Sequence, residues 1–416
     1  MDKTVVELFA GVGGFRVGLN RITNLDFEGR AIENGDWDFV WANQWEPSTK
    51  AQHAFECYCT RFGYENNSNI DISLVDKQMI PDHNLLLGGF PCQDYSVARS
   101  LSGEKGIEGK KGVLFWDIAD TLHIKSPAFV LLENVDRLLK SPSKQRGRDF
   151  GIMLRTFYDE GYNVEWRVIN AADYGAAQRR RRTFIFAWKK ITQYQHDMQS
   201  YDLDEIILHK GLFARAFPVY LNQENEILSI NINEDNFKDT VDISDNFVFN
   251  FQNSGCMIDG QILTFKTSPI VERSVTLQEI LTHNVDERYY LSDEQKEKFT
   301  FLKGAKKIPR VRPNGEPYYF SEGSIAYPDY LDQPGRTMLT SEGTINRSTH
   351  IVEDLDTHRL RFLTPVEAER LQNFPDNWTA TNMTDRQRYF MMGNALVTYL
   401  ITRVEPILSD IFSREP

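Results

Sequence analysis

The chain has 416 residues and a net charge of −12, with 41% hydrophobic and 25% charged residues. This composition is typical of a globular protein with room for one large domain and a smaller one, and it excludes a membrane-spanning helix because no stretch of about 18 apolar residues occurs. Four cysteines without the spacing of a zinc site, and an N-terminus without the features of a secretory signal, predict a metal-free protein of the reducing cytoplasm.

Short apolar runs alternate with helical patterns over the first 190 residues. The expected elements, in chain order, are strand 4–9, helix 15–21, strand 39–42, helix 48–62, strand 85–87, helix 114–124, strand 128–132, helix 150–160, strand 163–169 and strand 183–188. This alternation predicts an α/β fold with a mostly parallel sheet. Ligands of such sheets bind at the carboxyl ends of the strands, so the residues that follow the strands are the candidates for a site.

The pattern changes at about residue 191. Asn, Asp, Gly and Pro become frequent and helical periodicity fades until about residue 358. Regular order then returns with a helix start, in which Thr364 is the cap, Pro365 the first helical residue and Glu367 the third residue after the cap. We therefore predict a first domain over 1–190, an inserted domain over 191–358, and a return to the first domain over 359–416.

A glycine-rich turn follows the first strand and opens the first helix. It reads Phe9-Ala10-Gly11-Val12-Gly13-Gly14. Glycines let a ligand approach the backbone closely, but the spacing departs from GxGxxG because Arg16 stands where the last glycine belongs. An adenosine-type cofactor without a pyrophosphate is therefore favoured over a nicotinamide dinucleotide. A purely structural turn is the alternative.

Aromatic and acidic residues follow the next two strand ends. Glu46 could accept both hydroxyls of a ribose and Trp45 could cover an adenine ring. On position alone, a half-buried core tryptophan and a helix-capping glutamate are slightly favoured. Asp71 could bind the adenine amino group while Ile72 packs on the ring, and a turn aspartate is an equal alternative.

A cysteine and a glutamate stand at two further strand ends. Cys92 follows Pro91 among glycine and polar neighbours, which suits a reactive thiol better than a buried one, and the arginines of 179–182 could lower its pKa. Glu133 ends an apolar strand, where a carboxyl should have a raised pKa and could hold a proton near neutrality. A helix-capping role next to Asn134 is the alternative for this glutamate.

Basic residues cluster at two places in this acidic chain, 179–182 and 303–312. An acidic body with local basic patches can bind DNA while its other face repels it. A solvated surface is the alternative for each cluster.

Five motifs occur together in one order. They are the glycine turn 9–14, Pro91-Cys92-Gln93, Glu133-Asn134-Val135, Gln178-Arg179-Arg180-Arg181-Arg182 and Gly393-Asn394. From Glu7 to Ala187, and again from Leu360 to Leu400, the chain resembles the cytosine-C5 DNA methyltransferases of bacterial restriction-modification systems. The resemblance implies a Rossmann-like S-adenosylmethionine-dependent methyltransferase sheet with a smaller, irregular target-recognition domain inserted into it.

The resemblance also implies a mechanism. The target cytosine leaves the duplex, the Cys92 thiolate adds to its C6, and C5 takes the methyl group of S-adenosylmethionine, which becomes S-adenosylhomocysteine. Protonated Glu133 would bond to N3, Asn134 would position it, and Arg182 would hold the same base edge. Three further residues are expected to hold phosphates or to fill the space that the base vacates: Gln93, Ser96 and Arg180.

Two larger sets of residues follow from the resemblance. The expected cofactor-binding residues are Phe9, Ala10, Gly11, Gly13, Gly14, Trp45, Glu46, Asp71, Ile72, Pro91, Leu114, Asn394 and Ala395. The inserted domain would choose the DNA sequence, because arginine can bind guanine with two hydrogen bonds. Its candidates for base or phosphate contacts are Arg310, Arg312, Arg336, Thr337, Thr340 and Arg347, with surface charge or a structural turn as the alternative for each.

The sequence departs from the family pattern at two positions. Gln44 stands where the family often has an acid, so the ribose contact falls either to Glu46 or to neither. Ala395 stands where a serine often follows the last Gly-Asn pair, which implies a lost hydrogen bond there.

The expected partner is double-stranded DNA, the expected state a monomer, and a cognate restriction endonuclease could act separately. Two other interpretations stay open. One is a tRNA cytosine-C5 methyltransferase of the same fold, which the large inserted domain disfavours. The other is a catalytically silent DNA-binding homologue, which the intact Pro91–Cys92 and Glu133–Asn134 pairs disfavour.

Overall fold

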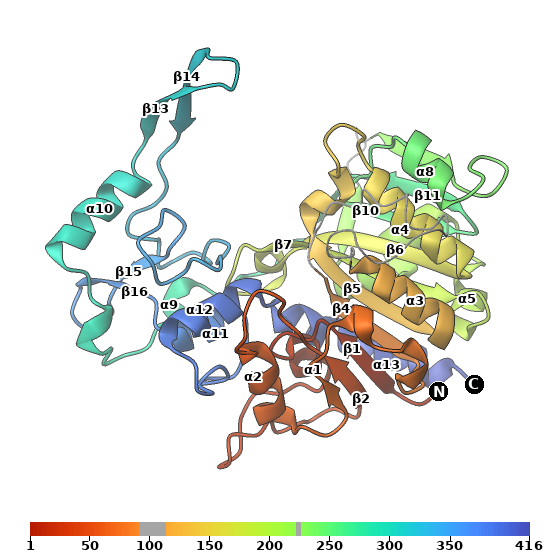
Figure 1. Cartoon of the computed structure of the whole chain (residues 1–416), viewed down its shortest axis with the longest axis horizontal. Coiled ribbons are helices and arrows are strands. Elements are labelled where there is room, and N and C mark those ends of the chain that lie inside the picture. The colour runs from red at the N-terminus through yellow and green to blue at the C-terminus, as the bar shows by residue number, and fades with distance from the viewer. Residues whose placement is uncertain (91–113, 222–225) are drawn as a thin grey trace.

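A ten-stranded sheet forms the centre of the computed structural model, which describes residues 1–90, 114–221 and 226–416 (Figure 1). In spatial order the strands are β3 (Asn67–Ser68), β2 (Asp38–Asn43), β1 (Thr4–Leu8), β4 (Leu85–Gly89), β5 (Phe129–Val135), β7 (Arg181–Lys189), β6 (Tyr162–Asn170), β10 (Ser254–Ile258), β11 (Gln261–Phe265) and β9 (Ile227–Asn231). Neighbours from β3 to β5 pair in parallel. Because β7 is antiparallel to both β5 and β6, strand β6 runs the same way as β5. The predicted α/β fold with a mostly parallel sheet is confirmed.

Successive residues of the central strands enter two different cores. Val5 of β1 and Leu131 of β5 pack on one face of the sheet, whereas the adjacent Val6 and Leu132 pack on the other. Side chains alternate between the faces of a strand, so a sheet that is covered on both faces needs apolar residues at nearly every position. This explains the uninterrupted apolar runs from which these strands were predicted.

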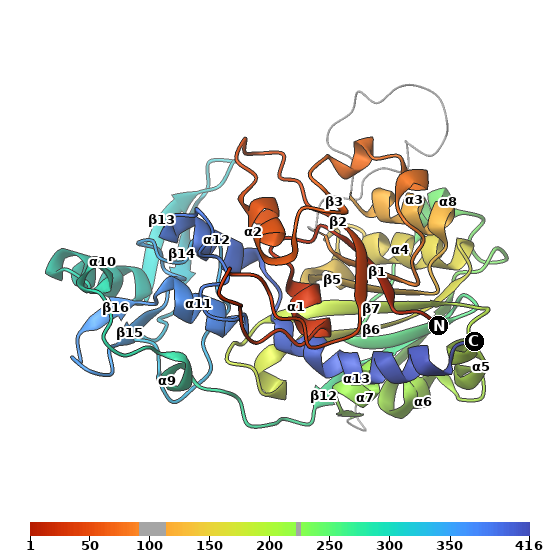
Figure 2. The same cartoon turned by 90° about the horizontal axis from the view of Figure 1, so that it is seen from below.

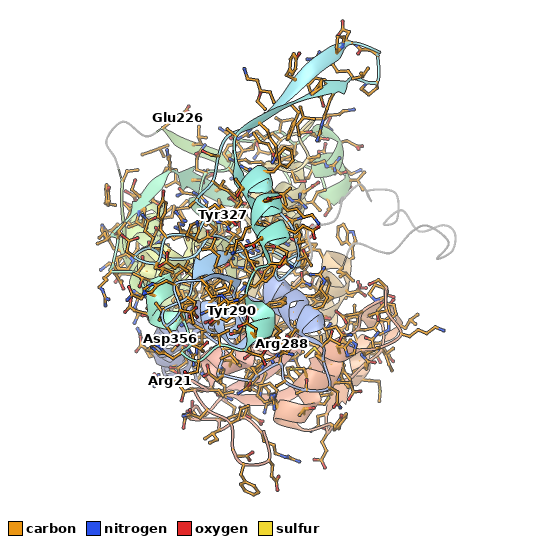
Figure 3. All side chains as sticks on the ribbon, turned by 90° about the vertical axis from the view of Figure 1, so that its left-hand side faces the viewer. Arg21, Glu226, Arg288, Tyr290, Tyr327 and Asp356 are labelled. Atoms are coloured by element: carbon orange, nitrogen blue, oxygen red, sulfur yellow. The ribbon has the colours of Figure 1, made fainter. Side chains whose placement is uncertain are left out.

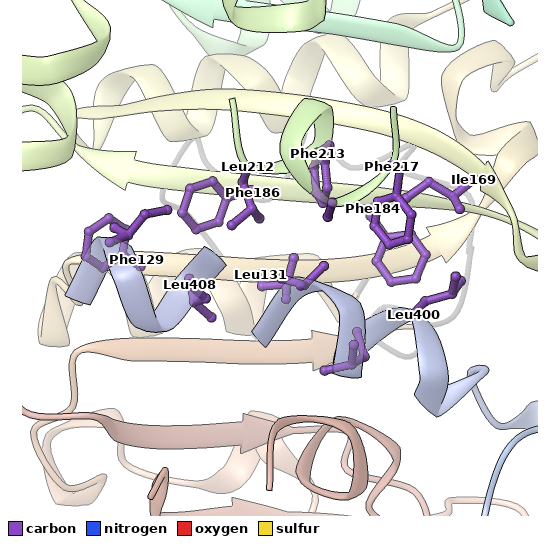
Figure 4. Packing of buried hydrophobic residues seen from close by; sticks show 14 of the residues in the cluster. Phe129, Leu131, Ile169, Phe184, Phe186, Leu212, Phe213, Phe217, Leu400 and Leu408 are labelled. Atoms are coloured by element: carbon purple, nitrogen blue, oxygen red, sulfur yellow. The ribbon is translucent and has the colours of Figure 1, made fainter. Parts of the chain in front are cut away.

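Helices cover both faces of the sheet (Figure 2). The first face carries α1 (Gly14–Leu19), α5 (Gln193–Met198), α7 (Leu212–Ala216) and α13 (Thr398–Arg414), and the second carries α3 (Phe115–Lys125), α4 (Arg148–Asp159) and α8 (Thr240–Asn246). Figure 4 shows Phe129, Leu131 and Phe186 of the sheet facing Leu408 of α13 and Phe213 of α7. The C-terminal helix therefore returns to the sheet with which the chain begins.

Residues 191–269 remain attached to the large sheet. Strands β10, β11 and β9 extend it beyond β6, and α6 (Leu203–Glu205), the π-helical η5 (Ile206–Lys210) and the small sheet of β8 (Val219–Leu221) and β12 (Thr267–Pro269) lie in the same segment. The sequence placed the start of a separate domain at about residue 191, whereas the chain contributes strands to the large sheet as far as Phe265. Buried residues such as Cys256 and Met257 hold β10 against β6, and the surrounding Asn, Asp and Gly masked this pattern.

A smaller part of the structure stands at one end of the molecule (Figure 1). It contains α9 (Leu277–Ile280), the 3₁₀ turn η6 (Glu287–Tyr289), α10 (Asp293–Lys303), β13 (Lys306–Val311), β14 (Pro317–Glu322), β15 (Ile351–Glu353), β16 (Leu360–Phe362), α11 (Pro365–Leu371) and α12 (Asp385–Asn394). Helix α11 begins with the predicted capping box, in which the Glu367 N–H donates to the Thr364 hydroxyl. Trp378 packs here against Cys57 of α2 (His53–Phe62), so the smaller part shares a core with the N-terminal helices.

The two ends of the chain lie side by side (Figures 1 and 2). The amino group of Met1 donates to the carbonyl of Glu415 over 3.0 Å. Short 3₁₀ turns complete the sheet connections: η1 (Ile72–Leu74), η2 (Lys77–Met79), η3 (Asp136–Lys140) and η4 (Ala171–Tyr174). In the three described ranges, no helix has both the length and the apolar character that crossing a membrane requires.

Candidate active site

A carboxylate and a guanidinium meet where β5 ends and β7 begins. In the antiparallel ladder Val135 pairs with Arg182. Glu133 lies two residues before Val135, so its side chain points to the same face as that of Arg182. Arg182 Nε is 2.9 Å from Glu133 Oε1, and the two side chains are only 19% and 14% exposed. The register of two strands thus builds this pair.

The environment of Glu133 acts on its proton in two opposite ways. Burial raises the pKa of this carboxyl above its ordinary value, and the positive charges of Arg182 and Arg180 oppose the rise. Desolvation is the larger effect, as expected for a carboxyl at the end of an apolar strand. Glu133 can therefore hold a proton more readily than an exposed glutamate, with a cation beside it that stabilises the ionised form.

Asn134 connects the end of β5 to the start of the predicted nucleophile loop. Its side chain is buried, and its Nδ2 donates to the carbonyl of Phe90 over 2.9 Å while its Oδ1 accepts from the Val135 N–H. Gly89 pairs with Glu133 in the parallel ladder of β4 and β5. The chain therefore enters the loop directly beside Glu133. Four predicted residues, Pro91, Cys92, Gln93 and Ser96, lie outside the described residues.

Arg180 is placed differently from the expectation that it holds a phosphate. Its side chain is buried, with the residue 2% exposed, and it donates to the carbonyls of Met338 and Gly393 over 3.0 and 2.9 Å. Burial lowers its pKa to about 9. A guanidinium already bonded to two backbone carbonyls is not available to DNA in this structure. Arg180 instead ties the start of β7 to two segments that are distant in sequence.

Two glycines of the turn have backbone angles that residues with a side chain rarely adopt. Gly11 and Gly13 have φ angles of 56° and 88°. A Cβ added to Gly13 would lie 2.6 Å from the Phe62 ring, whereas one added to Gly11 would meet no atom of the described residues within 4 Å. The Gly11 N–H donates to Gln44 Oε1 over 2.8 Å. Gly11 therefore presents bare backbone to open space, which a ligand could approach.

The remaining expected cofactor residues of this region differ in their surroundings. Trp45 is 37% exposed, and Glu46 is half-buried, with a pKa that burial raises. Among the described residues, no side chain or backbone group donates a hydrogen bond to the Glu46 carboxylate, while the Gln44 amide oxygen is occupied by Gly11. Asp71 accepts from the Ser73 N–H and hydroxyl, as a turn aspartate does. Ile72, next to it, is buried in the core beneath the sheet.

Two more segments border the glycine turn. A Cβ on Gly14 would lie 3.0 Å from the Leu396 side chain, so the end of α12, with Asn394 and Ala395, lies close to the turn. Asn394 is exposed and Ala395 is half-buried. Leu114 directly precedes α3 and packs against the core cluster that contains Phe90. The expected cofactor residues in the described ranges thus come from three strand ends, the start of α3 and the end of α12.

The candidates for DNA contacts fall into two groups. Arg336 binds Asp329 through both its Nε and Nη2, at 2.6 and 3.1 Å, and Arg347 donates to the carbonyl of Leu302, so both are structural. The Thr337 hydroxyl donates to the carbonyl of Arg179, and the backbone carbonyl of Thr340 accepts from Arg386. Only the last two candidates are exposed and lie away from the contacts between the 178–182 segment and the smaller part. They are on the β13–β14 hairpin: Arg310 and Arg312.

Two further residues of this region make contacts that the sequence did not predict. Gln178 is fully buried, accepts from the Met338 N–H and donates to the carbonyl of Leu371, so it joins β7 to the smaller part together with Arg180. Glu7 is fully buried on β1 below the glycine turn, and its Oε2 accepts from the Tyr58 hydroxyl. The signal for Glu7 was a single acid inside an otherwise apolar strand.

The family model described as C-5 cytosine-specific DNA methylase matches residues 3–408. The chain belongs to this family. The methylase is 55% identical to the Type II methyltransferase M.Sau3AI of Staphylococcus aureus, over 99% of the chain and 98% of that relative. It is 32% identical to the Type II methyltransferase M.HhaI of Haemophilus parahaemolyticus, over 46% of the chain and 50% of that relative.

Solved structures of low sequence identity share the fold of the methylase. The S. pombe Dnmt2 methyltransferase superimposes with a TM-score of 0.57 at 15% identity, over 99% of the chain and 98% of that structure. A putative DNA modification methyltransferase encoded within an E. coli prophage has a TM-score of 0.51 at 17% identity, over 99% of both chains. The fold is that of the S-adenosylmethionine-dependent methyltransferases, and the methylase is a DNA (cytosine-5-)-methyltransferase.

Proposed function

We propose that this enzyme transfers a methyl group from S-adenosylmethionine to C5 of a cytosine that is flipped out of a specific duplex DNA sequence, and that it protects host DNA in a restriction-modification system. The observation that carries the proposal is the bond from Asn134 to the Phe90 carbonyl. It holds the start of the Cys92 loop beside Glu133, so a base that is bonded by this carboxyl would lie next to the loop. Double-stranded DNA is the proposed partner, with any cognate endonuclease acting separately, and we propose a cytoplasmic monomer.

Cys92 is assigned as the nucleophile because the other three cysteines are unsuited to that role. Cys57, Cys59 and Cys256 are all buried. Burial raises the thiol pKa of Cys57 and Cys59 to about 12 and that of Cys256 well above its ordinary value. A thiolate is the nucleophilic form of cysteine, and these three thiols stay protonated near neutral pH. Cys92 is the remaining cysteine of the sequence.

Three residues where β5 ends and β7 begins have distinct parts in the proposed reaction. A protonated Glu133 donates to N3 of the cytosine, which offsets the negative charge that builds up on the ring when the Cys92 sulfur bonds to C6. Arg182, 2.9 Å from Glu133, holds this carboxyl and faces the same base edge. Asn134 is a positioning residue, because its side chain is used to fix the loop. C5 then takes the methyl group. When a base removes the C5 proton, the electrons of that bond re-form the double bond between C5 and C6, expel the Cys92 sulfur as thiolate, and the N3 proton returns to Glu133.

The residues around the glycine turn fit the proposed cofactor. Gly11 offers backbone with open space above it, the Glu46 carboxylate is half-buried without a hydrogen-bond donor in the described ranges, and the Trp45 ring is partly exposed. These are the features that an adenosine group requires: close backbone approach, an acceptor for the ribose hydroxyls and a flat apolar surface. We therefore assign the ribose to Glu46 and not to Gln44, whose amide oxygen is occupied by Gly11. S-adenosylmethionine, when bound, supplies the methyl group.

Bisulfite sequencing of DNA from cells that express the chain tests the proposal. The expected result is 5-methylcytosine within one short sequence context, and none when Cys92 is replaced by alanine. The Cys92→Ala protein is expected to keep its affinity for duplex DNA, because the thiol serves bond formation and not docking. Normal methylation by Cys92→Ala, or methyl groups on adenine or on an exocyclic nitrogen, would contradict the mechanism.

Two assays separate the proposal from its alternatives. Radiolabelled S-adenosylmethionine is supplied with duplex DNA or with tRNA, and label is expected only in the DNA. A duplex that carries 5-fluorocytosine at the methylated position is expected to form a stable covalent complex, because fluorine at C5 cannot leave as a proton does. A protein that binds DNA but never forms this complex would be a catalytically silent homologue.

A further inference from the structure

The backbone of Glu46 is held on both sides by one amide side chain. The Glu46 N–H donates to Gln52 Oε1 over 2.8 Å, and the Glu46 carbonyl accepts from Gln52 Nε2 over 2.9 Å. The same Gln52 amide also donates to the Thr49 carbonyl and accepts from Asn69, the residue that follows β3. These bonds use only the backbone of Glu46. The loop that carries the carboxylate is therefore fixed, while the carboxylate oxygens stay available to a ligand.

The residue that follows Gln52 joins this loop to α12. His53 is the first residue of α2, and its Nε2 lies 2.6 Å from Nε2 of Gln387 on α12. Both side chains are half-buried, and Figures 1 and 2 show the two helices side by side. His53 therefore lies between the loop of Glu46 and a helix whose other end borders the glycine turn.

The hydrogen bonds of Gln387 decide which ring nitrogen of His53 carries the proton. Gln387 is the third residue of α12, and within the capping box its Oε1 accepts from the Thr384 N–H and hydroxyl over 2.8 and 3.0 Å. The amide nitrogen therefore faces His53, and because an amide NH₂ can only donate, the His53 Nε2 is the acceptor. His53 is thus neutral, with its proton on Nδ1. A proton added at Nε2 would set two donors against each other and break the bond to α12.

The carboxyl of Glu46 responds to a charge on His53. Burial raises the pKa of this carboxyl, and a positive His53 opposes the rise, so the two side chains lie within reach of each other's charge. Lys50, on the loop between them, is exposed. Other charged side chains at the starts of the two helices bond elsewhere: Glu56 to Tyr64, Arg386 to the Thr340 carbonyl, Arg388 to Glu369, and Asp385 to Arg288, which Figure 3 labels. A protonated His53 would therefore act on Glu46.

We propose that His53 is a positioning residue for the cofactor: when neutral it ties the loop of Glu46 to α12 and leaves the carboxylate to the ribose, and when protonated it releases α12 and attracts the carboxylate. This rests on the proposed function, in which Glu46 accepts from the ribose hydroxyls. Histidine changes its charge between about pH 5 and 8, so the affinity for the cofactor falls as the pH drops through this range. By linkage, the neutral imidazole is favoured when the cofactor is bound.

Calorimetry with S-adenosylhomocysteine at about pH 6 and about pH 8 tests the inference. The ratio of the dissociation constants at the two pH values is expected to be about 5-fold larger for the wild-type enzyme than for His53→Gln, the lower end of the usual coupling between sites. Glutamine keeps an acceptor oxygen for the Gln387 amide but takes up no proton, so its affinity at the higher pH should match that of the wild type. The comparison also removes the effect of Glu46, whose carboxyl takes up a proton at low pH in both proteins.

Gln387→Glu should change the pH response in the opposite direction. Glu279 and Glu367 occupy the same position in two other capping boxes of the chain, so glutamate should preserve the start of α12. Its carboxylate oxygen, in place of the amide NH₂, would accept from a protonated His53. The fall in affinity is therefore expected to begin about 1 pH unit or more higher than in the wild type. His123→Gln is the matched control, because this exposed histidine lies on α3, away from both helices.

NMR spectra of isotope-labelled histidine side chains in the free enzyme give the tautomer directly. The signals of His53 are those that are absent from His53→Gln, and an unprotonated Nε2 is expected at about pH 8. A proton on Nε2 at this pH would contradict the contact with Gln387 and overturn the inference. An equal pH response of the wild type and His53→Gln would overturn it as well. Melting curves of all variants, followed by circular dichroism, check that a changed affinity does not come from unfolding.

These outcomes are separable from a failure of the proposed function. Glu46→Gln is expected to bind S-adenosylhomocysteine more weakly than the wild type at about pH 8. Unchanged binding by Glu46→Gln, or no binding by the wild-type enzyme at either pH, would contradict the cofactor assignment of the proposed function. Binding by His53→Gln with the pH response of the wild type would leave that assignment intact and would remove only His53 from its role.

Discussion

At the scale of single residues, the segments packed around the site decide which of its side chains can act. Glu133 lies, as expected, in a partly buried position that raises its pKa. The four consecutive arginines could not be distinguished in this way. In the structure Arg180 is buried, Arg182 pairs with Glu133, and Arg181 is 61% exposed. Which arginine turns inward depends on the segments that pack against β7, and those come from residues that lie more than 150 positions later in the chain.

Replacing Glu133 by glutamine should lower turnover by about 10²- to 10⁴-fold, the usual contribution of a general acid or base. Glutamine keeps the shape and can still donate a hydrogen bond, but it cannot share a proton with N3. Steady-state assays with Glu297→Gln on α10 as the control measure the effect. For the wild-type enzyme, kcat should fall as the pH rises through the raised pKa of Glu133, because the protonated form is lost. Retained activity in Glu133→Gln would remove Glu133 from this role.

Replacing Glu7 by glutamine should stabilise the fold at alkaline pH. Burial raises the pKa of Glu7 from its ordinary value of 4.5 to about 8. A carboxyl whose pKa is higher in the folded state favours folding when it is protonated, so stability falls as the pH rises from about 4.5 to 8. The loss is of order 1.4 kcal/mol per pH unit within this window. Urea unfolding at pH 5 and pH 8 should show a gain for Glu7→Gln that is larger at pH 8, and no such pH dependence for the exposed Glu65→Gln.

At the scale of elements, the predicted strands and helices of the first 190 residues are all present. Their ends differ from the predicted ones where a neighbouring element determines where the strand or helix stops. Strand β5 continues to Val135 because β7 pairs with it as far as Arg182. The helix expected from residue 48 begins at His53. The strands β9 to β11 could not be predicted as part of the large sheet, because short antiparallel strands among turn residues carry no signal for the sheet that they join. The start of α11 at Thr364 could be predicted, because a capping box depends only on residues close together in the sequence.

Replacing Gly393 by alanine should disturb the packing of α12 against the backbone at Leu339 and Thr340. A Cβ on Gly393 would lie 2.5 Å from the backbone of Leu339 and Thr340, where no flexible side chain can yield. Overpacking of this kind costs about 1–3 kcal/mol, and here it would also displace Asn394 from the glycine turn. Calorimetry should show weaker binding of S-adenosylhomocysteine and a lower melting temperature. Gly323→Ala is the control, since a Cβ there meets no atom within 4 Å; equal effects of the two changes would contradict the packing argument.

At the scale of the whole molecule, the segment from Gln178 to Arg182 connects the parts that the proposed reaction uses together. Its residues bond to the backbone at Met338, in the part that carries the hairpin, and at Gly393, next to the glycine turn. Its last residue holds Glu133. The motif was predicted from its arginines as a site for DNA. In the structure this segment also holds three places in fixed positions relative to one another. They are the end of α12 beside the glycine turn, the end of β5 at Glu133, and the backbone at Met338.

Replacing Arg180 by alanine should therefore weaken the contacts that hold the start of β7 against Met338 and Gly393. Two buried carbonyls would lose their donor, at a cost of about 1–3 kcal/mol each, and the free energy of unfolding should fall accordingly in urea titrations. Arg181→Ala is the matched control from the same cluster, because this exposed side chain forms a surface ion pair with Asp136 at 3.4 Å, and such pairs contribute little. The Arg180→Ala enzyme should also bind both S-adenosylhomocysteine and duplex DNA more weakly than the wild-type enzyme does. If Arg180 contacted a phosphate instead, its loss would lower the salt dependence of DNA binding and leave both stability and cofactor affinity unchanged.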